Sequence, residues 1–189
     1  MYVVYTIDMN TLILLIVFVV LAWIVISYNG FIQLTNRANE AWSDIDVQLK
    51  RRFDLIPNLV TTVKAYAKHE KTVFEEVTQA RVKAMNASSV HDKDVANGAV
   101  KDAVGKILAI AENYPTLMAS DNFKKLQDEL TDTEDTIASA RKYYNGTVRN
   151  LNIKIHSFPD MLIASVAGFK PREFFEADEE ERGAVDVKA

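Results

Sequence analysis

Residues 12–26 read LILLIVFVVLAWIVI, an unbroken apolar run inside an uncharged stretch that extends from Met9 to Asn36. At about 1.5 Å of helical rise per residue, roughly 20 residues match a hydrocarbon core of about 30 Å, which residues 9–28 supply. The run is apolar on every face, which is not typical of a helix in a soluble core. No Lys or Arg precedes it and no small-residue cleavage site follows it, so we interpret it as a retained membrane anchor and not as a cleaved signal.

The basic residues near the anchor predict its orientation. None precedes the run, whereas Arg37 and the cluster at 50–52 follow it. By the positive-inside rule, the N-terminus is expected outside and the rest of the chain in the cytoplasm. We therefore expect a single-pass protein of the plasma (inner) membrane, with a short extracytoplasmic N-terminus at 1–8 and a transmembrane helix at 9–30 that contacts the lipid bilayer.

Composition limits the remaining part of the chain. The 189 residues leave about 150 beyond the anchor, enough for one domain with its own core. The 22 Lys and Arg are scattered among 26 Asp and Glu, a net charge of −4, which argues against a nucleic-acid partner. The chain has no Cys, so disulfides, thiol catalysis and cysteine metal sites are excluded.

A helical stripe begins soon after the anchor. Between Ala38 and Ala84 the apolar residues recur at spacings of three and four, which is typical of an amphipathic helix that buries one face. Pro57 interrupts this pattern and leaves two alternatives. Asp54 could cap a new helix with Pro57 in its first turn, or Pro57 could kink a single continuous rod. The stripe consists of Ala38, Trp42, Ile45, Leu49, Ile56, Leu59, Val63, Tyr66, Val73, Val77, Ala80 and Ala84.

Two further helices are predicted downstream. Residues 93–113 form a weak helix with glycines at 98 and 105, which either only weaken it or admit a close backbone. Tyr114 and Pro115 should stop it. The last helix begins at Ser120 or Asp121, has a regular apolar seam from 123 to 151, and must end at Pro159.

A short apolar segment at 161–169 follows that helix and precedes an acidic tail at 170–189. The charge density of the tail is typical of a solvated chain end. We expect Phe174 and Phe175 to pin the start of the tail to the helical domain.

Two charged residues, Arg52 and Glu70, fall on otherwise apolar stripes. They either form a register-setting ion pair or ligand site, or lie at bundle ends where they reach water. With a turn at Asp54 they would lie roughly 24 Å apart along the helix axis and could not pair with each other in one subunit. Each would then need water, a residue of the last helix, or a neighbouring subunit.

Catalytic patterns are weak in this sequence. The histidines at 69, 91 and 156 lack the spacing of a helical zinc site, and the clustered carboxylates face different ways on a helix. We therefore expect no enzyme, no metal and no cofactor. The residues with candidate interaction or structural roles are Trp42, Arg52, Pro57, Glu70, Tyr114 and Pro115.

Two blocks carry a family resemblance. EAWSDIDVQLKRR at 40–52 with DLIPNLV at 54–60, and ENYP at 112–115 with NFKKLQDEL at 122–130, closely resemble the signature of the LemA family of bacterial membrane proteins. The resemblance implies an all-α chain, with the N-terminal transmembrane helix followed by an elongated up-and-down four-helix bundle over 31–169. It favours a turn at Pro57, with bundle helices at 31–53, 54–87, 93–113 and 120–158.

The resemblance supplies no activity and no catalytic residues. A relative in magnetosome-forming bacteria implies, by analogy, a role in organising membranes. We expect a non-enzymatic scaffold or interaction protein at the cytoplasmic face of a bacterial plasma membrane, as a homo-oligomer with a membrane or cytoplasmic protein partner. The alternative is an accessory factor of a membrane protease or envelope-stress system.

Overall fold

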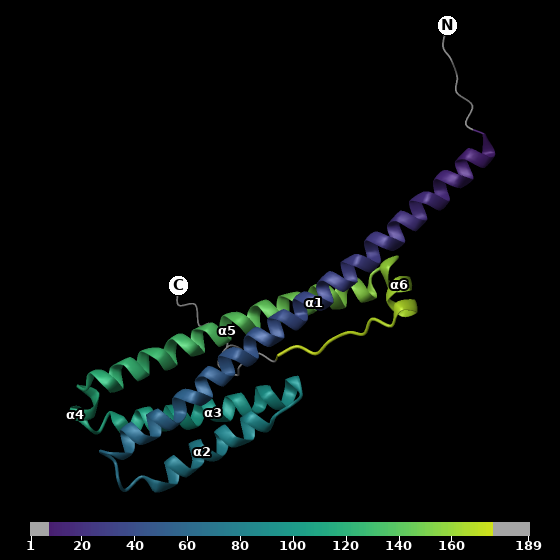
Figure 1. Ribbon diagram of the computed structural model, residues 1–189. Coiled ribbons are helices and arrows are strands. Elements are labelled where there is room, and N and C mark those ends of the chain that lie inside the picture. Colours follow the sequence, from purple (N-terminus) through teal and green to yellow (C-terminus); the bar gives the residue numbers. More distant parts are fainter. Residues whose placement is uncertain (1–7, 176–189) are drawn as a thin grey trace, which may run out of the picture. The chain divides into compact units, whose positions relative to one another are not determined.

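A computed structural model describes residues 8–175, and within that range every regular element is a helix (Figure 1). The elements are α1 (Met9–Lys64), α2 (Lys71–Asn86), α3 (Val90–Ala111), α4 (Pro115–Met118), α5 (Asp121–His156) and α6 (Asp160–Ala167). The described residues divide into two compact units, 8–39 with 146–172 and 40–145 with 173–175. The prediction of an all-α chain with an N-terminal apolar helix and bundle-like packing is confirmed.

α1 continues through Pro57, so the expected turn at Asp54 is wrong. Proline lacks the N–H that would bond to the carbonyl of the residue four positions earlier, Phe53. Arg81 of α2 donates its Nε–H to that carbonyl oxygen at 2.7 Å and replaces the lost bond. The buried stripe also stays in register across the proline, since Leu49 and Ile56 are both buried. The single-rod alternative is therefore confirmed.

The expected helix at 54–87 is instead interrupted between α1 and α2. The N–H groups of Tyr66 and Ala67 both bond to the carbonyl of Val63, at 3.0 and 2.9 Å, which tightens the last turn of α1. Ala67 is buried in the turn. Tyr66 is exposed, so its predicted place in the buried stripe is wrong. Glu70, one of the two charged residues on the predicted stripes, is the residue that directly precedes α2.

The shorter helices α2 and α3 pack against each other. The Ser89 hydroxyl caps α3 by accepting the N–H of Asp92 at 3.0 Å. A Cβ added at Gly98 or Gly105 would meet no atom within 4 Å, so the alternative in which these glycines admit a close backbone is wrong. Tyr114 and Pro115 end the run as predicted, with Pro115 starting the four-residue α4.

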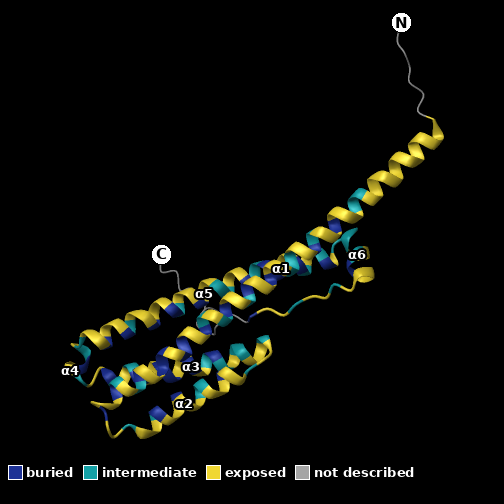
Figure 2. Cartoon of the chain, in the orientation of Figure 1, coloured by how far each residue is buried: buried dark blue, intermediate teal, exposed yellow. Residues whose placement is uncertain are grey.

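The last long helix follows the prediction closely. The Ser120 hydroxyl accepts the N–H of Phe123 at 3.2 Å, which identifies Ser120 as the cap of α5. The seam is buried except at Ala140, which is partly exposed. Figure 2 shows this stripe as a dark row along α5. The buried seam residues are Phe123, Leu126, Leu130, Thr133, Ile137, Tyr144, Thr147 and Leu151.

The first unit holds the apolar run and a small core. The run itself is exposed and uncharged, long and apolar enough to cross a membrane (Figure 2). The core consists of Phe31, Leu151, Ile155 and Ala164. Gly168 ends α6 with a φ of 76°, a left-handed conformation that glycine adopts without strain, and the chain turns back so that Phe169 stacks on Phe31 at 4.8 Å.

A polar cluster joins α6 to α1 and α5 within this unit. The Ser27 hydroxyl donates to one carboxylate oxygen of Asp160 at 2.5 Å, and Lys154 Nζ lies 2.8 Å from the other. Burial acts to raise the pKa of Asp160, but these hydrogen bonds and the charge of Lys154 outweigh it, and the pKa lies below its ordinary value of 3.8.

Candidate functional site

A buried cation lies in the core of the second unit. Arg52 of α1 is completely buried. Its Nη1 is 2.5 Å from Glu134 Oε1 of α5, and its Nη2 donates to the backbone oxygen of Asn97 of α3 at 3.5 Å. We call Arg52, Asn97 and Glu134 the polar layer. Because a charge that is desolvated in a core needs its partners in place, this layer favours one register of three helices.

The structure distinguishes among the alternatives left open for Arg52 and Glu70. Arg52 pairs with the last helix, one of the three partners that the sequence left open, and it does not reach water. Glu70 is partly exposed and directly precedes α2, in the segment that connects α1 to α2. The two residues are not brought together, so the structure does not place them in one site.

A second ion pair fastens α3 to α5 nearby. Arg141 Nη2 lies 3.0 Å from Asp94 Oδ1, and both side chains are largely buried. On the other side, Lys93 of α3 pairs with Asp46 of α1 and lies 4.7 Å above the ring of Trp42. α3 is therefore held by ion pairs to both long helices, although its own sequence is a weak helix former.

Trp42 belongs to an aromatic cluster with Tyr144 and Phe175. The three ring pairs have centroid distances of 5.4 to 5.7 Å. Trp42, expected in the buried stripe, is partly exposed, and its ring packs against Lys93 of α3, Tyr144 of α5 and Phe175.

The start of the tail is pinned as predicted, through one of the two phenylalanines. Phe175 is buried, whereas Phe174 is exposed. The Asn145 amide accepts the N–H of Phe175 and donates to its carbonyl, both at 2.9 Å, as a paired strand would. The Tyr144 hydroxyl donates to the Glu173 carbonyl at 3.2 Å. The rest of the acidic tail lies outside the described residues.

An open groove runs between α2 and α3. It has a volume of about 660 Å³, and its walls carry several alanines and the exposed side chains of Val82 and Val95. Elsewhere on this helix pair, Lys106 of α3 lies 2.8 Å from Glu76 of α2. That hydrogen bond and the charge of Glu76 raise the pKa of Lys106. The residues of the groove are Ala80, Val82, Lys83, Asn86, Ala87, Ser88, His91, Asp92, Val95, Ala96 and Ala99.

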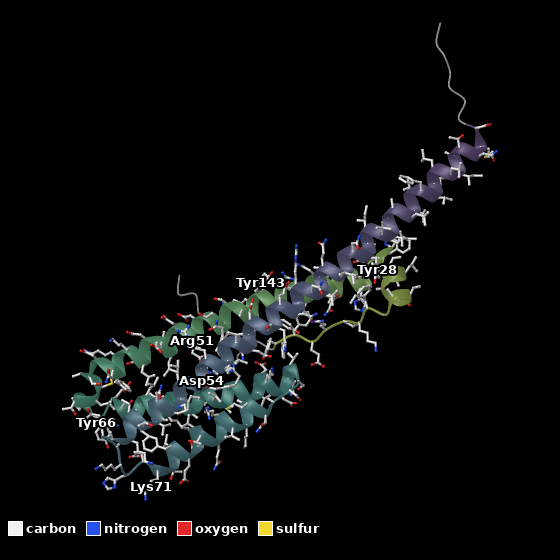
Figure 3. The ribbon with its side chains drawn as sticks, viewed as in Figure 1. Tyr28, Arg51, Asp54, Tyr66, Lys71 and Tyr143 are labelled. Carbon is white, nitrogen blue, oxygen red and sulfur yellow. The ribbon has the colours of Figure 1, made fainter. Side chains whose placement is uncertain are left out.

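A smaller pocket of about 270 Å³ adjoins α1, α2 and α3. Its lining combines apolar Leu49 and Phe53 with charged Asp54 and Lys93. Figure 3 labels Asp54 on α1. Across residues 8–175, no three His, Asp or Glu side chains are grouped so that they could hold a metal ion.

The remaining sequence candidates have structural positions. Pro57 lies inside α1, and Tyr114 and Pro115 form the junction between α3 and α4. Sequence reasoning missed Arg81, Glu134 and Asn145, which supply the bonds described above. Of these three, only the role of Arg81 is indicated by the sequence, because a proline inside a helix leaves a carbonyl that needs a hydrogen-bond donor.

A family model described as the LemA family matches residues 41–188. The chain belongs to the LemA family. The match includes the polar layer, the aromatic cluster and the groove, and it begins after the apolar run. Together with the exposed apolar part of α1, family membership makes this a membrane-associated protein.

The relatives that this chain resembles include magnetosome proteins. Magnetosome protein MamQ of Magnetospirillum gryphiswaldense is 28% identical over 174 residues, which cover 78% of this chain and 64% of that protein. Protein LemA of Metamycoplasma hominis is 26% identical over 160 residues, covering 84% of this chain and 73% of that protein. The chain thus spans slightly less than two thirds of the first relative.

Proposed function

We propose that this protein is a non-enzymatic, membrane-anchored scaffold that recruits polypeptide partners at the inner face of a bacterial plasma membrane. The observation that carries the proposal is the groove between α2 and α3. It combines an open apolar surface with a position on the domain that the family model matches. The relatives named magnetosome proteins carry the same domain, which supports a membrane-associated role.

The lining of the groove fits a helix of another polypeptide. Ala80, Ala96 and Ala99 are small, so a second backbone can approach closely, and Val82 and Val95 offer exposed apolar contacts at its walls. Amphipathic helices bind such grooves through residues spaced three and four apart. The rim carries Lys83 and Asp92, charges of both signs that would select among partners.

The proposed topology rests on the basic residues that follow the apolar run. We propose residues 1–8 outside, 9–30 across the membrane, 31–169 as the helical domain in the cytoplasm and 170–189 as an acidic tail there. A reporter that is active only outside the membrane, fused after Ala189, should be silent. Strong reporter activity would contradict the cytoplasmic placement.

Photo-crosslinking from the groove tests the scaffold function. A photoreactive amino acid replaces Val95 in the full chain within native membranes, and the matched control replaces Lys124, which is exposed on α5. Val95 should give discrete products that Lys124 does not. Adducts of the chain with itself support a homo-oligomeric scaffold, and adducts with several membrane or cytoplasmic proteins support recruitment.

Two outcomes would contradict the proposal. If a single membrane protease dominates the Val95 products, the protein is an accessory factor of that protease. If Val95 and Lys124 give the same pattern, the groove is not a binding surface and the scaffold proposal loses its support.

A further inference from the structure

The helix α6 is apolar on nearly all sides. Its inner face packs into the core of the first unit through Ile163 and Ala164. Its outer face and the preceding turn expose Phe158, Met161, Leu162 and Val166, with Phe158 80% and Val166 90% exposed. A helix that is apolar all round is typically buried in protein or in lipid. Among the described residues of this unit, no protein segment covers the outer face.

The contacts of α6 fix its position along α1. Its first residue, Asp160, accepts the hydroxyl hydrogen bond of Ser27, the residue that directly follows the apolar run. Phe169, just after α6, packs on Tyr28 at 5.8 Å and stacks on Phe31 (Figure 3 labels Tyr28 beside α6). α6 therefore lies beside the point where the run ends.

That point coincides with the boundary of the bilayer. If residues 9–28 span a hydrocarbon core of about 30 Å, Ser27 lies within one helical turn of the boundary. Apolar faces of interfacial helices lie about 5–10 Å deep, in the headgroup and acyl boundary. α6 would therefore lie at the depth of the membrane surface, where its outward side chains can contact lipid directly.

We propose that α6 and Phe158 form an interfacial foot, whose exposed apolar side chains lie in the surface of the membrane that α1 crosses. The occupant of this face is phospholipid. The exposed Lys170 follows α6 and would meet anionic headgroups favourably. This proposal depends on α1 being a membrane span. The foot would give the protein a second contact with the bilayer besides that span.

Accessibility of spin labels tests the foot directly. Because the chain contains no Cys, single cysteines can be introduced at Val166, Ile13 and Asn150 without first removing native cysteines. Ile13 lies in the apolar run, and Asn150 is exposed on α5 in the same unit, about 9 Å along that helix from its end. The full chains are reconstituted in vesicles of phosphatidylcholine and phosphatidylglycerol.

Labels in lipid collide more with oxygen, and labels in water collide more with a soluble nickel complex. We expect the oxygen-to-nickel collision ratio at Val166 to exceed that at Asn150 several-fold and to approach that at Ile13. Because the side chain of Val166 is almost fully exposed, its replacement should leave the fold intact, which circular dichroism checks.

Three outcomes would overturn the inference, and they are distinguishable. A Val166 ratio equal to that at Asn150, with Ile13 in lipid, means that the foot is in water. A Val166 label shielded from both reagents means that protein covers α6. An Ile13 label accessible to nickel means that α1 is not a span, which removes the premise of the foot together with the proposed membrane anchorage.

Discussion

The bond from Arg81 to the Phe53 carbonyl is expected to make Pro57 tolerable inside α1. Proline in a helix interior costs about 3 kcal/mol, partly through the unmade hydrogen bond and partly through a steric clash. Arg81 Nε lies 2.7 Å from the orphaned oxygen, and Phe53 is buried, so water is a poor substitute. Arg81→Met keeps the apolar stem but removes the donor.

The expected magnitude follows from the charge on the donor. Hydrogen bonds to charged groups contribute about 1.5–3 kcal/mol, and a buried unsatisfied carbonyl costs about 1–3 kcal/mol. We therefore expect Arg81→Met to lower the free energy of unfolding by about 2 kcal/mol. In a Pro57→Ala background the new N–H of residue 57 can bond to the same carbonyl, so the loss should fall to less than about 1 kcal/mol. The coupling between the two changes would be about 1–2 kcal/mol.

The assay is chemical and thermal unfolding of the full chain in detergent, followed by far-UV circular dichroism. About 2 kcal/mol corresponds to a midpoint shift of roughly 4–8 °C for a domain of this size. Arg51→Met is the matched control, because Arg51 is an exposed arginine on α1 (Figure 3). Equal losses from Arg81→Met in the two backgrounds would show that Arg81 does not compensate for the proline, and the account of α1 given above would fail.

Five further substitutions test three other contacts. Trp42→Ala should cost about 3 kcal/mol, since large aromatic truncations cost about 3–5 kcal/mol and Trp42 is only partly buried, whereas Trp42→Phe should cost less; urea unfolding measures both. Glu134→Ala should destabilise the protein by more than Arg52→Met does, because the former keeps the buried guanidinium and removes the carboxylate 2.5 Å from it, whereas the latter removes the buried charge itself. The lowered pKa of Asp160 means that its stabilising contribution is complete above the ordinary value of 3.8 and is lost as the pH falls through the folded pKa. The protection factors of the α6 amides, which correct for the pH dependence of intrinsic exchange, should therefore fall at acid pH in the wild type and change less in Asp160→Asn.

The apolar spacing in the sequence was sufficient to predict α3 and α5. The seam of α5 and the cap at Ser120 follow directly from the order of residues, because both depend on neighbours within a few positions. The continuity at Pro57 could not be predicted in the same way. It depends on Arg81, which lies 24 residues further along the chain and reaches Phe53 only after α2 has folded back.

The candidate site residues also divide into those that the local sequence identifies and those that depend on distant segments. Arg52 was identifiable as a charge on an apolar stripe, and the last helix was one of its expected partners, but nothing in the local sequence distinguishes Glu134 from its acidic neighbours. Asn145 had no signal at all, since its role depends on the backbone of Phe175 arriving beside it. Partners that come from distant segments are set by tertiary packing, which a periodicity pattern does not contain.

The burial pattern along the described part of α1 changes at a single position. From residue 12 to residue 26 no side chain is buried, as expected for a helix surrounded by lipid. Ser27 is the first buried residue, and Phe31, Ala38, Ala41 and Ile45 continue a stripe from it at spacings that are multiples or sums of three and four. Ser27 is also the residue that binds Asp160 of α6. The helical face of α1 that packs against protein therefore begins where α6 attaches. If residues 9–28 cross the membrane as proposed, an outer face of α6 that contacted only water would leave its apolar side chains in water beside the lipid boundary.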